Sequence, residues 1–283
     1  TCYREPSLQF NKIYALNLSM KDLVSFNSLN RNMSDFLRIC ISSFNNILVS
    51  SSRGGGGHSL LKVISDFYYK DIAVGAFLEN QDATYREDFH LFDFNNIGHK
   101  KNLRILIDEF KLESLVFDNL SRKAPLEQMD LIRDNQGSVL LFPESNSSNS
   151  AISDLEFRLH KTKPKIMLEK LREFIVRTFK IHVHIERLED GSRKITSISE
   201  LALSPEFEIL EKKIFKFEEK SLGSRGEIVG DFLATEYVPS FLDEKVKKGF
   251  FKIPRGIFEN TKPEDEVPPG LPGEESGFGF DDE

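Results

Sequence analysis

The sequence has no tryptophan, and only two of its 283 residues are cysteines. Cys2 and Cys40 do not have the spacing of a Cys-x-x-Cys motif, which argues against a zinc ribbon and a thioredoxin-type redox site. Cys40 lies in the apolar stretch FLRICI, so we expect a buried, unreactive thiol in a reducing compartment.

Long hydrophobic runs are also absent. No stretch approaches the roughly 18 to 20 apolar residues that span a bilayer, and no secretory signal is visible. The formal net charge is −7 and the sequence pI about 5.5, which argues against a nucleic-acid partner. We therefore expect a cytoplasmic protein without direct membrane insertion, which reaches the inner face of a membrane only by recruitment to a membrane-bound partner.

Short apolar runs alternate with amphipathic segments along the first half of the chain. The runs that have the length of buried strands are residues 45–50, 71–77, 113–120 and 137–143. The segments with helical spacing of apolar residues are 59–69, 102–112 and 125–136. This alternation predicts an α/β fold with a largely parallel sheet.

The second half of the chain has a different pattern. Residues 145–150 (SNSSNS) read as a polar loop, and residues 163–179 predict a long amphipathic helix with Pro164 in its first turn. Residues 180–203 contain two alternating runs around an Asp-Gly turn, which predicts a β-hairpin, and residues 206–220 can add further strands.

The end of the chain differs in composition from the rest. Residues 261–283 are rich in proline, glycine and acidic residues and cannot bury enough apolar surface to fold by themselves. We therefore predict one domain over residues 1–260 and a disordered acidic tail over residues 261–283.

A glycine-rich loop follows the first predicted strand, in ILVSSSRGGGGHSLLKVI (residues 47–64). A strand, a glycine loop and a helix in this order are typical of the phosphate-binding motif G-x-x-x-x-G-K-[ST], but no lysine is present. Without a gap the lysine position is Gly57 and the hydroxyl position His58; shifted by one residue they are His58 and Ser59. The following helix would then be capped by His58 or Ser59.

Two interpretations of this loop remain open at the level of sequence. The four glycines can present backbone N–H groups to an anion at the helix N-terminus, or they can form a linker that binds nothing. The residues concerned are Ser51, Gly54, Gly55, Gly56, Gly57, His58 and Ser59.

Three longer segments resemble one known family. Residues 23–61, 184–201 (HIERLEDGSRKITSISEL) and 215–258 are similar to the RecA-like motor domain of the secretion and pilus-assembly traffic ATPases, closest to the Tad/CpaF branch. The resemblance covers roughly residues 7–258 and implies a three-layer αβα core with a mostly parallel sheet, a late β-hairpin and C-terminal helices. The family's N-terminal domain has no counterpart in this sequence.

The resemblance also implies where a motor of this family would hold its catalytic groups, and most of those positions are altered. At the Walker B strand, Asp118 and Asn119 stand in place of a Gly-Glu pair, and Asn119 cannot accept a proton as a general base. At the end of the fourth strand, Pro143 stands in place of a histidine. The acidic positions after the second strand match Ala76 and Phe77, and Glu79 would read as a solvent-facing residue.

The family's arginines that reach a neighbouring nucleotide are also not retained. His90 and Phe94 stand near their positions, and the nearby Arg86, Lys100 and Lys101 read as surface charges.

His182 and His184 alternate on one predicted strand. Such a pair could ligate a metal, but no third ligand is in view, so we expect two half-exposed strand histidines without a metal.

Phosphoryl transfer depends on positioned charges, so loss of the lysine, the glutamate and the histidine together predicts a pseudo-ATPase. No cofactor is expected beyond weak anion or nucleotide binding at the glycine loop. The partner would be an active paralogous ATPase or an inner-membrane pilus or secretion platform. The alternatives are a divergent active ATPase and a sensor of another nucleotide.

Overall fold

The computed structural model describes residues 18–79, 85–94, 100–242 and 256–260. Its centre is a nine-stranded sheet with the order β3-β2-β4-β5-β1-β6-β7-β8-β9. The strands are β1 (Ile47–Ser51), β2 (Val74–Leu78), β3 (His90–Asp93), β4 (Ser114–Phe117), β5 (Val139–Pro143), β6 (Ile181–Arg187), β7 (Arg193–Leu203), β8 (Ile209–Leu222) and β9 (Ile228–Ala234).

The pairings from β3 to β6 are all parallel, and those from β6 to β9 are antiparallel. This confirms the predicted α/β fold with a largely parallel sheet. The structure also contains β3, a short edge strand that the sequence pattern did not indicate. The pattern missed it because only one face of β3 is covered and Leu91 stays 53% exposed.

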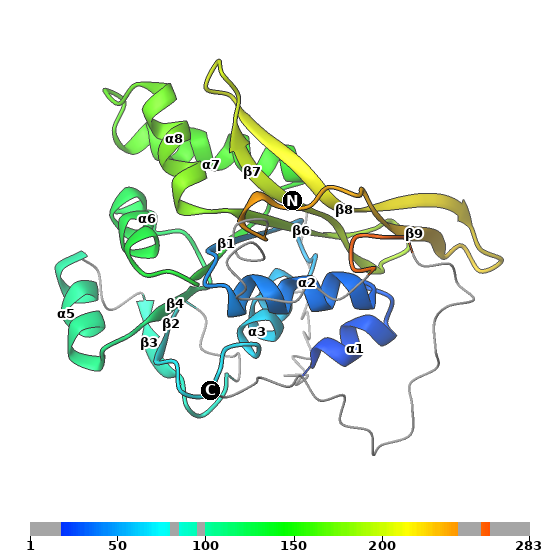
Figure 1. Ribbon diagram of the computed structural model, residues 1–283, viewed down its shortest axis with the longest axis horizontal. Helices are drawn as coiled ribbons and strands as arrows, with labels where there is room; N and C mark the ends of the chain where they lie inside the picture. The colour runs from blue at the N-terminus through cyan, green and yellow to red at the C-terminus, as the bar shows by residue number, and fades with distance from the viewer. Residues whose placement is uncertain (1–17, 80–84, 95–99, 243–255, 261–283) are drawn as a thin grey trace, which may run out of the picture.

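Helices cover both faces of the sheet (Figure 1). The helices α1 (Met20–Ser25), α2 (Arg31–Ser42) and α3 (Gly57–Ser65) bury their apolar sides in one core cluster. The helices α5 (Lys100–Phe110), α6 (Pro125–Asp134), α7 (Ser148–Thr162) and α8 (Leu168–Thr178) contribute to a second cluster on the opposite face. The result is the predicted three-layer arrangement, and none of the described helices is long and apolar enough to cross a membrane.

Two predictions for the segment between β5 and β6 are wrong. The polar loop of residues 145–150 ends early, because Ser147 and Ser150 form a capping box that starts α7 at Ser148. The helix predicted from residue 163 begins only at Leu168, and Pro164 lies in the turn before it. The first error comes from serines that act as a helix start signal, whereas α8 begins after Met167, which makes no side-chain cap.

The chain after β9 is described only in part. Residues 240–242 are helical, while most of the predicted C-terminal helix and the whole acidic tail lie outside the described residues. Asn260 Oδ1 accepts a hydrogen bond from the backbone N–H of Ala234 at 2.7 Å, and Asn30 Nδ2 donates one to the carbonyl of Phe232 at 3.5 Å. These side chains satisfy backbone groups of β9, the last strand of the described sheet.

The hairpin of β6 and β7 was predicted correctly, but its histidines are not half-exposed. His182 and His184 are each only 1% exposed, and both contact the hydroxyl of Ser50 on β1, through Nε2 and Nδ1 respectively at 2.7 Å. His182 Nδ1 lies 3.1 Å from Glu211 Oε2 on β8. Among the described residues no three His, Cys, Asp or Glu side chains come together in a way that could hold a metal.

The proton positions in this network follow from its geometry. With Glu211 ionised, a neutral His182 donates from Nδ1 and accepts the Ser50 proton at Nε2. Ser50 then accepts from the Nδ1–H of His184, which leaves His184 Nε2 as a buried lone pair without a partner. Burial, together with the nearby His182, lowers the pKa of His184 to about 4, despite the opposing effect of Glu211.

We predict that this histidine makes the protein less stable as the pH falls. Between the folded pKa of His184, about 4, and its ordinary pKa of 6.5, the unfolded chain takes up a proton that the folded chain does not. The stability is therefore fully present above pH 6.5 and is lost progressively below it. From about pH 7 to about pH 5 the expected loss is roughly 2 kcal/mol of unfolding free energy. Urea unfolding at several pH values measures it.

The matched control is His184→Asn, which keeps a side-chain donor for Ser50 and removes the titration. Its unfolding free energy should vary less with pH over the same range. An equally steep pH dependence in the variant would contradict the assignment to His184.

Candidate functional site

The glycine loop joins the carboxyl end of β1 to the first turn of α3. Gly56, with φ 89°, is the N-cap of α3, and the helix begins at Gly57. The prediction that His58 or Ser59 caps this helix is therefore wrong. The backbone N–H of Ser52 donates to the carbonyl of Ile185 on β6, at 3.1 Å, and Gly55 N–H donates to Ser52 O at 2.9 Å. The loop is therefore held against β6 by its own backbone.

Gly57 has no room for a side chain. A Cβ at this position would lie 2.5 Å from Ser51 Oγ and 2.8 Å from Leu141 Cδ1, closer than a carbon atom can approach. A lysine at Gly57, as the ungapped alignment requires, would not fit. The geometry agrees with the shifted register, in which Gly57 is the last glycine and the exposed His58 and Ser59 take the lysine and hydroxyl positions.

Two arginines of the β6–β7 hairpin lie beside this loop. Arg193 Nε donates to the carbonyl of Gly54 at 3.0 Å, and a Cβ on Gly56 would lie 3.0 Å from Arg193 Cδ. A Cβ on Gly54 would meet the side chain of Arg187 at 3.9 Å. Arg187 and Arg193 are paired across the hairpin, on either side of the Asp-Gly turn.

The sequence analysis did not assign these arginines to the loop. The signal that could have found them is their symmetric position around the turn, which makes them neighbours across the two strands. The sequence pattern does not show that β6 lies next to β1, and only that pairing brings the two arginines to the loop.

The carboxyl ends of β2 and β4 form a second group of polar residues. Both carboxylate oxygens of Asp118 accept the backbone N–H of Glu79, at 2.8 and 2.9 Å, and Asp118 is 2% exposed. Asn119 Nδ2 donates to Glu79 Oε2 at 2.8 Å. Asp118 thus fastens the end of β2.

Two expectations about β2 change with the structure. The strand continues to Leu78, so Ala76 and Phe77 are buried inside it and cannot stand at its end. Glu79 stands there instead, bonded to Asn119, and is not an ordinary solvent-facing residue. The error arose because the end of an apolar run does not fix the end of a strand.

The end of β5 lies next to the end of β1. Pro143 is paired with Ser51, and the backbone N–H of Ser145 donates to the Ser51 carbonyl at 2.8 Å. Between them, Glu144 has φ 69°, an uncommon value for a residue with a side chain, and is exposed. Pro143 brings no titratable group to this edge, and the next residue, Glu144, carries a carboxylate that the sequence analysis missed.

The residues compared with the family's arginines lie at the far edge of the sheet. His90 begins β3 with its ring 4.9 Å from that of Phe110, and the ring of Phe94 lies 5.5 Å from that of Phe117. Arg86 is bonded to Asp88 through Nε at 2.9 Å. These groups are engaged locally, and the side chains of Lys100 and Lys101 lie outside the described residues.

No protein-family model and no curated protein matches this chain. Solved structures do. The VirB11 ATPase from the Brucella suis type IV secretion system, in complex with sulphate, aligns with a TM-score of 0.53 and 16% identity over 67% of this chain and 57% of that one. The Legionella pneumophila ATPase DotB gives 0.48 and 13%, over 65% and 52% of the two chains. The pilus retraction motor PilT with bound ADP gives 0.45 and 14%, over 66% and 52%.

The chain spans 57% of the length of the VirB11 chain that it matches. At this identity the similarity concerns the fold alone. The described chain has the α/β fold, with a largely parallel central sheet, that is found in the secretion ATPase VirB11.

Proposed function

We propose that this chain is a catalytically inactive pseudo-ATPase related to the Tad/CpaF pilus and secretion ATPases. The observation that carries the proposal is the start of α3, where Gly57 has no space for a lysine and the next position is His58. A histidine is shorter than a lysine and has no ammonium group, so it is a poor replacement for a fixed ammonium group at a phosphate.

The remaining polar groups support the same conclusion. Asn119 has no basic oxygen for a proton, and Pro143 has no side-chain donor. Asp118 already accepts two hydrogen bonds from Glu79 N–H. Catalysis of phosphoryl transfer needs charged groups placed at the phosphates. With these replacements the chain has too few such groups to accelerate the reaction.

In this proposal the chain has a structural or regulatory role in a pilus or secretion assembly. The fold similarity to VirB11, an ATPase of a type IV secretion system, supports this class of assembly. The partner would be an active paralogous ATPase or a platform protein at the inner membrane, to which a cytoplasmic chain is recruited.

We predict that the chain shows no ATP turnover above a protein-free control and no Mg²⁺-dependent ATP binding by calorimetry. His58→Lys should introduce measurable ATP binding, because it supplies an ammonium group at the exposed first turn of α3. Gly57→Lys should instead lower the unfolding free energy by about 1 to 3 kcal/mol, because its side chain meets Ser51 and Leu141.

His160→Lys, which adds the same charge on α7, is the matched control and should bind no ATP. Turnover by the unmodified chain that disappears in His58→Ala would contradict the proposal. If that turnover also disappeared in Glu79→Gln, it would favour a divergent active ATPase that uses the carboxylate beside Asn119.

A second candidate is binding of another nucleotide or phosphorylated ligand without hydrolysis. The positions of Arg187 and Arg193 beside the glycine loop favour it, since guanidinium groups and backbone N–H groups both bind phosphate oxygens. Arg193 would have to exchange its bond to the Gly54 carbonyl for one to the ligand.

For this candidate we predict that inorganic pyrophosphate binds weakly and that Arg193→Gln weakens its binding about tenfold, the loss of one charge-assisted contact. Arg177→Gln, on the exposed part of α8, should leave the affinity unchanged. Calorimetry measures both. Absence of pyrophosphate binding, or equal binding by the Arg193 variant, would reject the second candidate and leave the first unaffected.

A further inference from the structure

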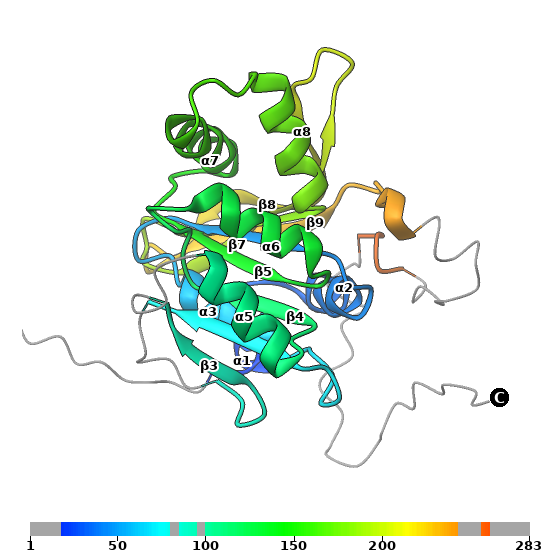
Figure 2. The same ribbon diagram turned by 90° about the vertical axis from the view of Figure 1, so that its left-hand side faces the viewer.

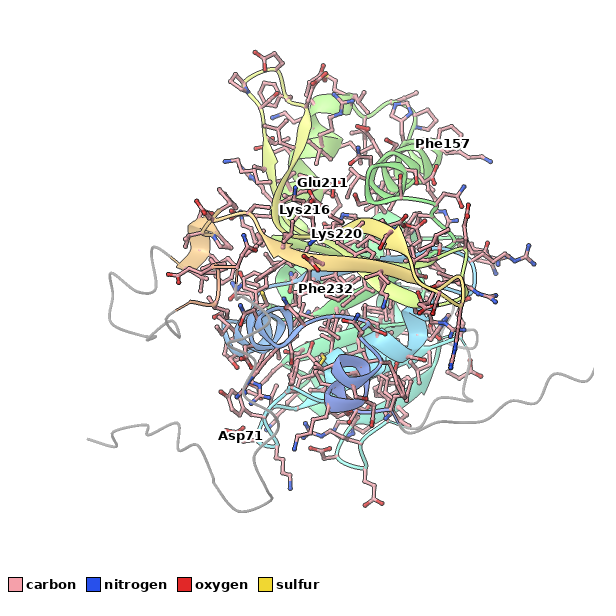
Figure 3. All side chains as sticks on the ribbon, turned by 90° about the vertical axis from the view of Figure 1, so that its right-hand side faces the viewer. Asp71, Phe157, Glu211, Lys216, Lys220 and Phe232 are labelled. Atoms are coloured by element: carbon pink, nitrogen blue, oxygen red, sulfur yellow. The ribbon has the colours of Figure 1, made fainter. Side chains whose placement is uncertain are left out.

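A pocket of about 480 Å³ lies between α7, α8 and the start of β8. Its lining includes Glu156 of α7, Arg172 of α8, and Glu208, Leu210, Glu211 and Lys213 at the start of β8. Figures 1 and 2 show α7, α8 and the turn between β7 and β8 at the same end of the molecule, and Figure 3 places Glu211 at the foot of the space between β8 and α7, the helix that carries Phe157. Its volume is within the range of pockets that hold ligands.

The wall of this pocket carries fixed negative charge. Glu211 is held by His182, and although burial raises the pKa of Glu211, the hydrogen bond from His182 and nearby positive charges outweigh this and keep it below the usual value. Arg172 is already bonded to Glu156, and through Nη1 to the carbonyl of Phe207 at 3.4 Å. Its charge is therefore largely used within the protein.

What remains in the wall is two carboxylates against one cation. Glu208 forms no ion pair within the described residues, although its charge acts on Arg172, and Lys213 on β8 is the other basic residue of the wall. The two acids with one lysine leave a net charge of −1, so the pocket fits a group that carries positive charge and hydrogen-bond donors.

The two residues that we call the lip of the pocket are apolar and exposed: Leu210 lines the pocket, and the carbonyl of Phe207 contacts Arg172 of its wall. Phe207, in the turn that leads into β8, is 45% exposed, and Leu210 is 40% exposed. Phe207 has φ 60°, a value at which a glycine would be favoured, and the turn is held by Ser204 Oγ, which accepts the N–H groups of Glu206 and Glu208 at 3.1 Å. An exposed aromatic residue therefore occupies a turn position at which the backbone conformation favours glycine.

We propose that this pocket and its lip are a docking site for a basic segment of a partner protein, with an arginine or lysine side chain in the pocket and neighbouring apolar side chains on Phe207 and Leu210. A cation alone would use only the carboxylates, and a purely apolar segment would bury the carboxylate of Glu208 without a partner. An exposed aromatic beside a charged pocket is the arrangement in which a few residues carry most of a binding energy. The site lies on the sheet face opposite α3.

The test uses the full chain and a short fluorescein-labelled peptide that contains one arginine flanked by leucines, followed by fluorescence anisotropy. Glu208→Gln should weaken binding about tenfold and Phe207→Gly about tenfold or more. Phe207→Gly suits the backbone of the turn, so unchanged or higher thermal stability would show that lost binding is not lost folding.

The matched controls are Glu206→Gln, an exposed neighbour outside the pocket, and Leu222→Ser, an apolar residue 72% exposed at the far end of β8. Both should bind the peptide as the unmodified chain does, while a peptide with glutamate in place of arginine should not bind. Equal binding by the Phe207 and Glu208 variants would overturn the proposal. Binding of arginine amide as tight as that of the peptide would also overturn it, in favour of a small-molecule site.

Discussion

The position of β1 between β5 and β6, with all five of its residues buried, is the constraint on which the rest of the structure depends. A strand in the middle of a sheet must place neighbouring side chains on opposite faces. Ser50 therefore enters the layer of α7 and α8, where both histidines of β6 contact its hydroxyl. Ser51 enters the layer of α3, where its side chain fills the space in front of Gly57.

This placement links the altered glycine loop to packing. Because α3 approaches β1 and β5 so closely, only glycine fits at its first position, and the first residue that can carry a side chain is His58. Polar groups near this edge of the sheet are used to hold the chain together. Asp118 fastens the end of β2, and Arg193 is bonded to the loop itself. Under the proposed function such groups serve the fold, whereas a motor would need them free for its substrate.

The antiparallel half of the sheet gives the molecule a second polar region. Glu211 belongs both to the buried histidine network and to the wall of the pocket below α7. Its carboxylate is kept in place by His182, and a fixed charge at the edge of a pocket discriminates better between ligands than a mobile one. Phe207 is exposed, and its carbonyl contacts Arg172 of the same pocket, so charge and apolar surface meet at one end of the molecule.

The sequence by itself determined the alternation of strands and helices, the β6–β7 hairpin and the absence of a lysine from the glycine loop, because these depend on local periodicity, turn residues and residue identity. It misplaced Glu79 by ending β2 too early, and it judged His182 and His184 to be half-exposed. Only the tertiary structure decided these points, together with the register of the loop and its contact with Arg193. The physical reason is that burial and close approach come from strands that are distant in sequence: β1 lies beside β6 only because the sheet places them together.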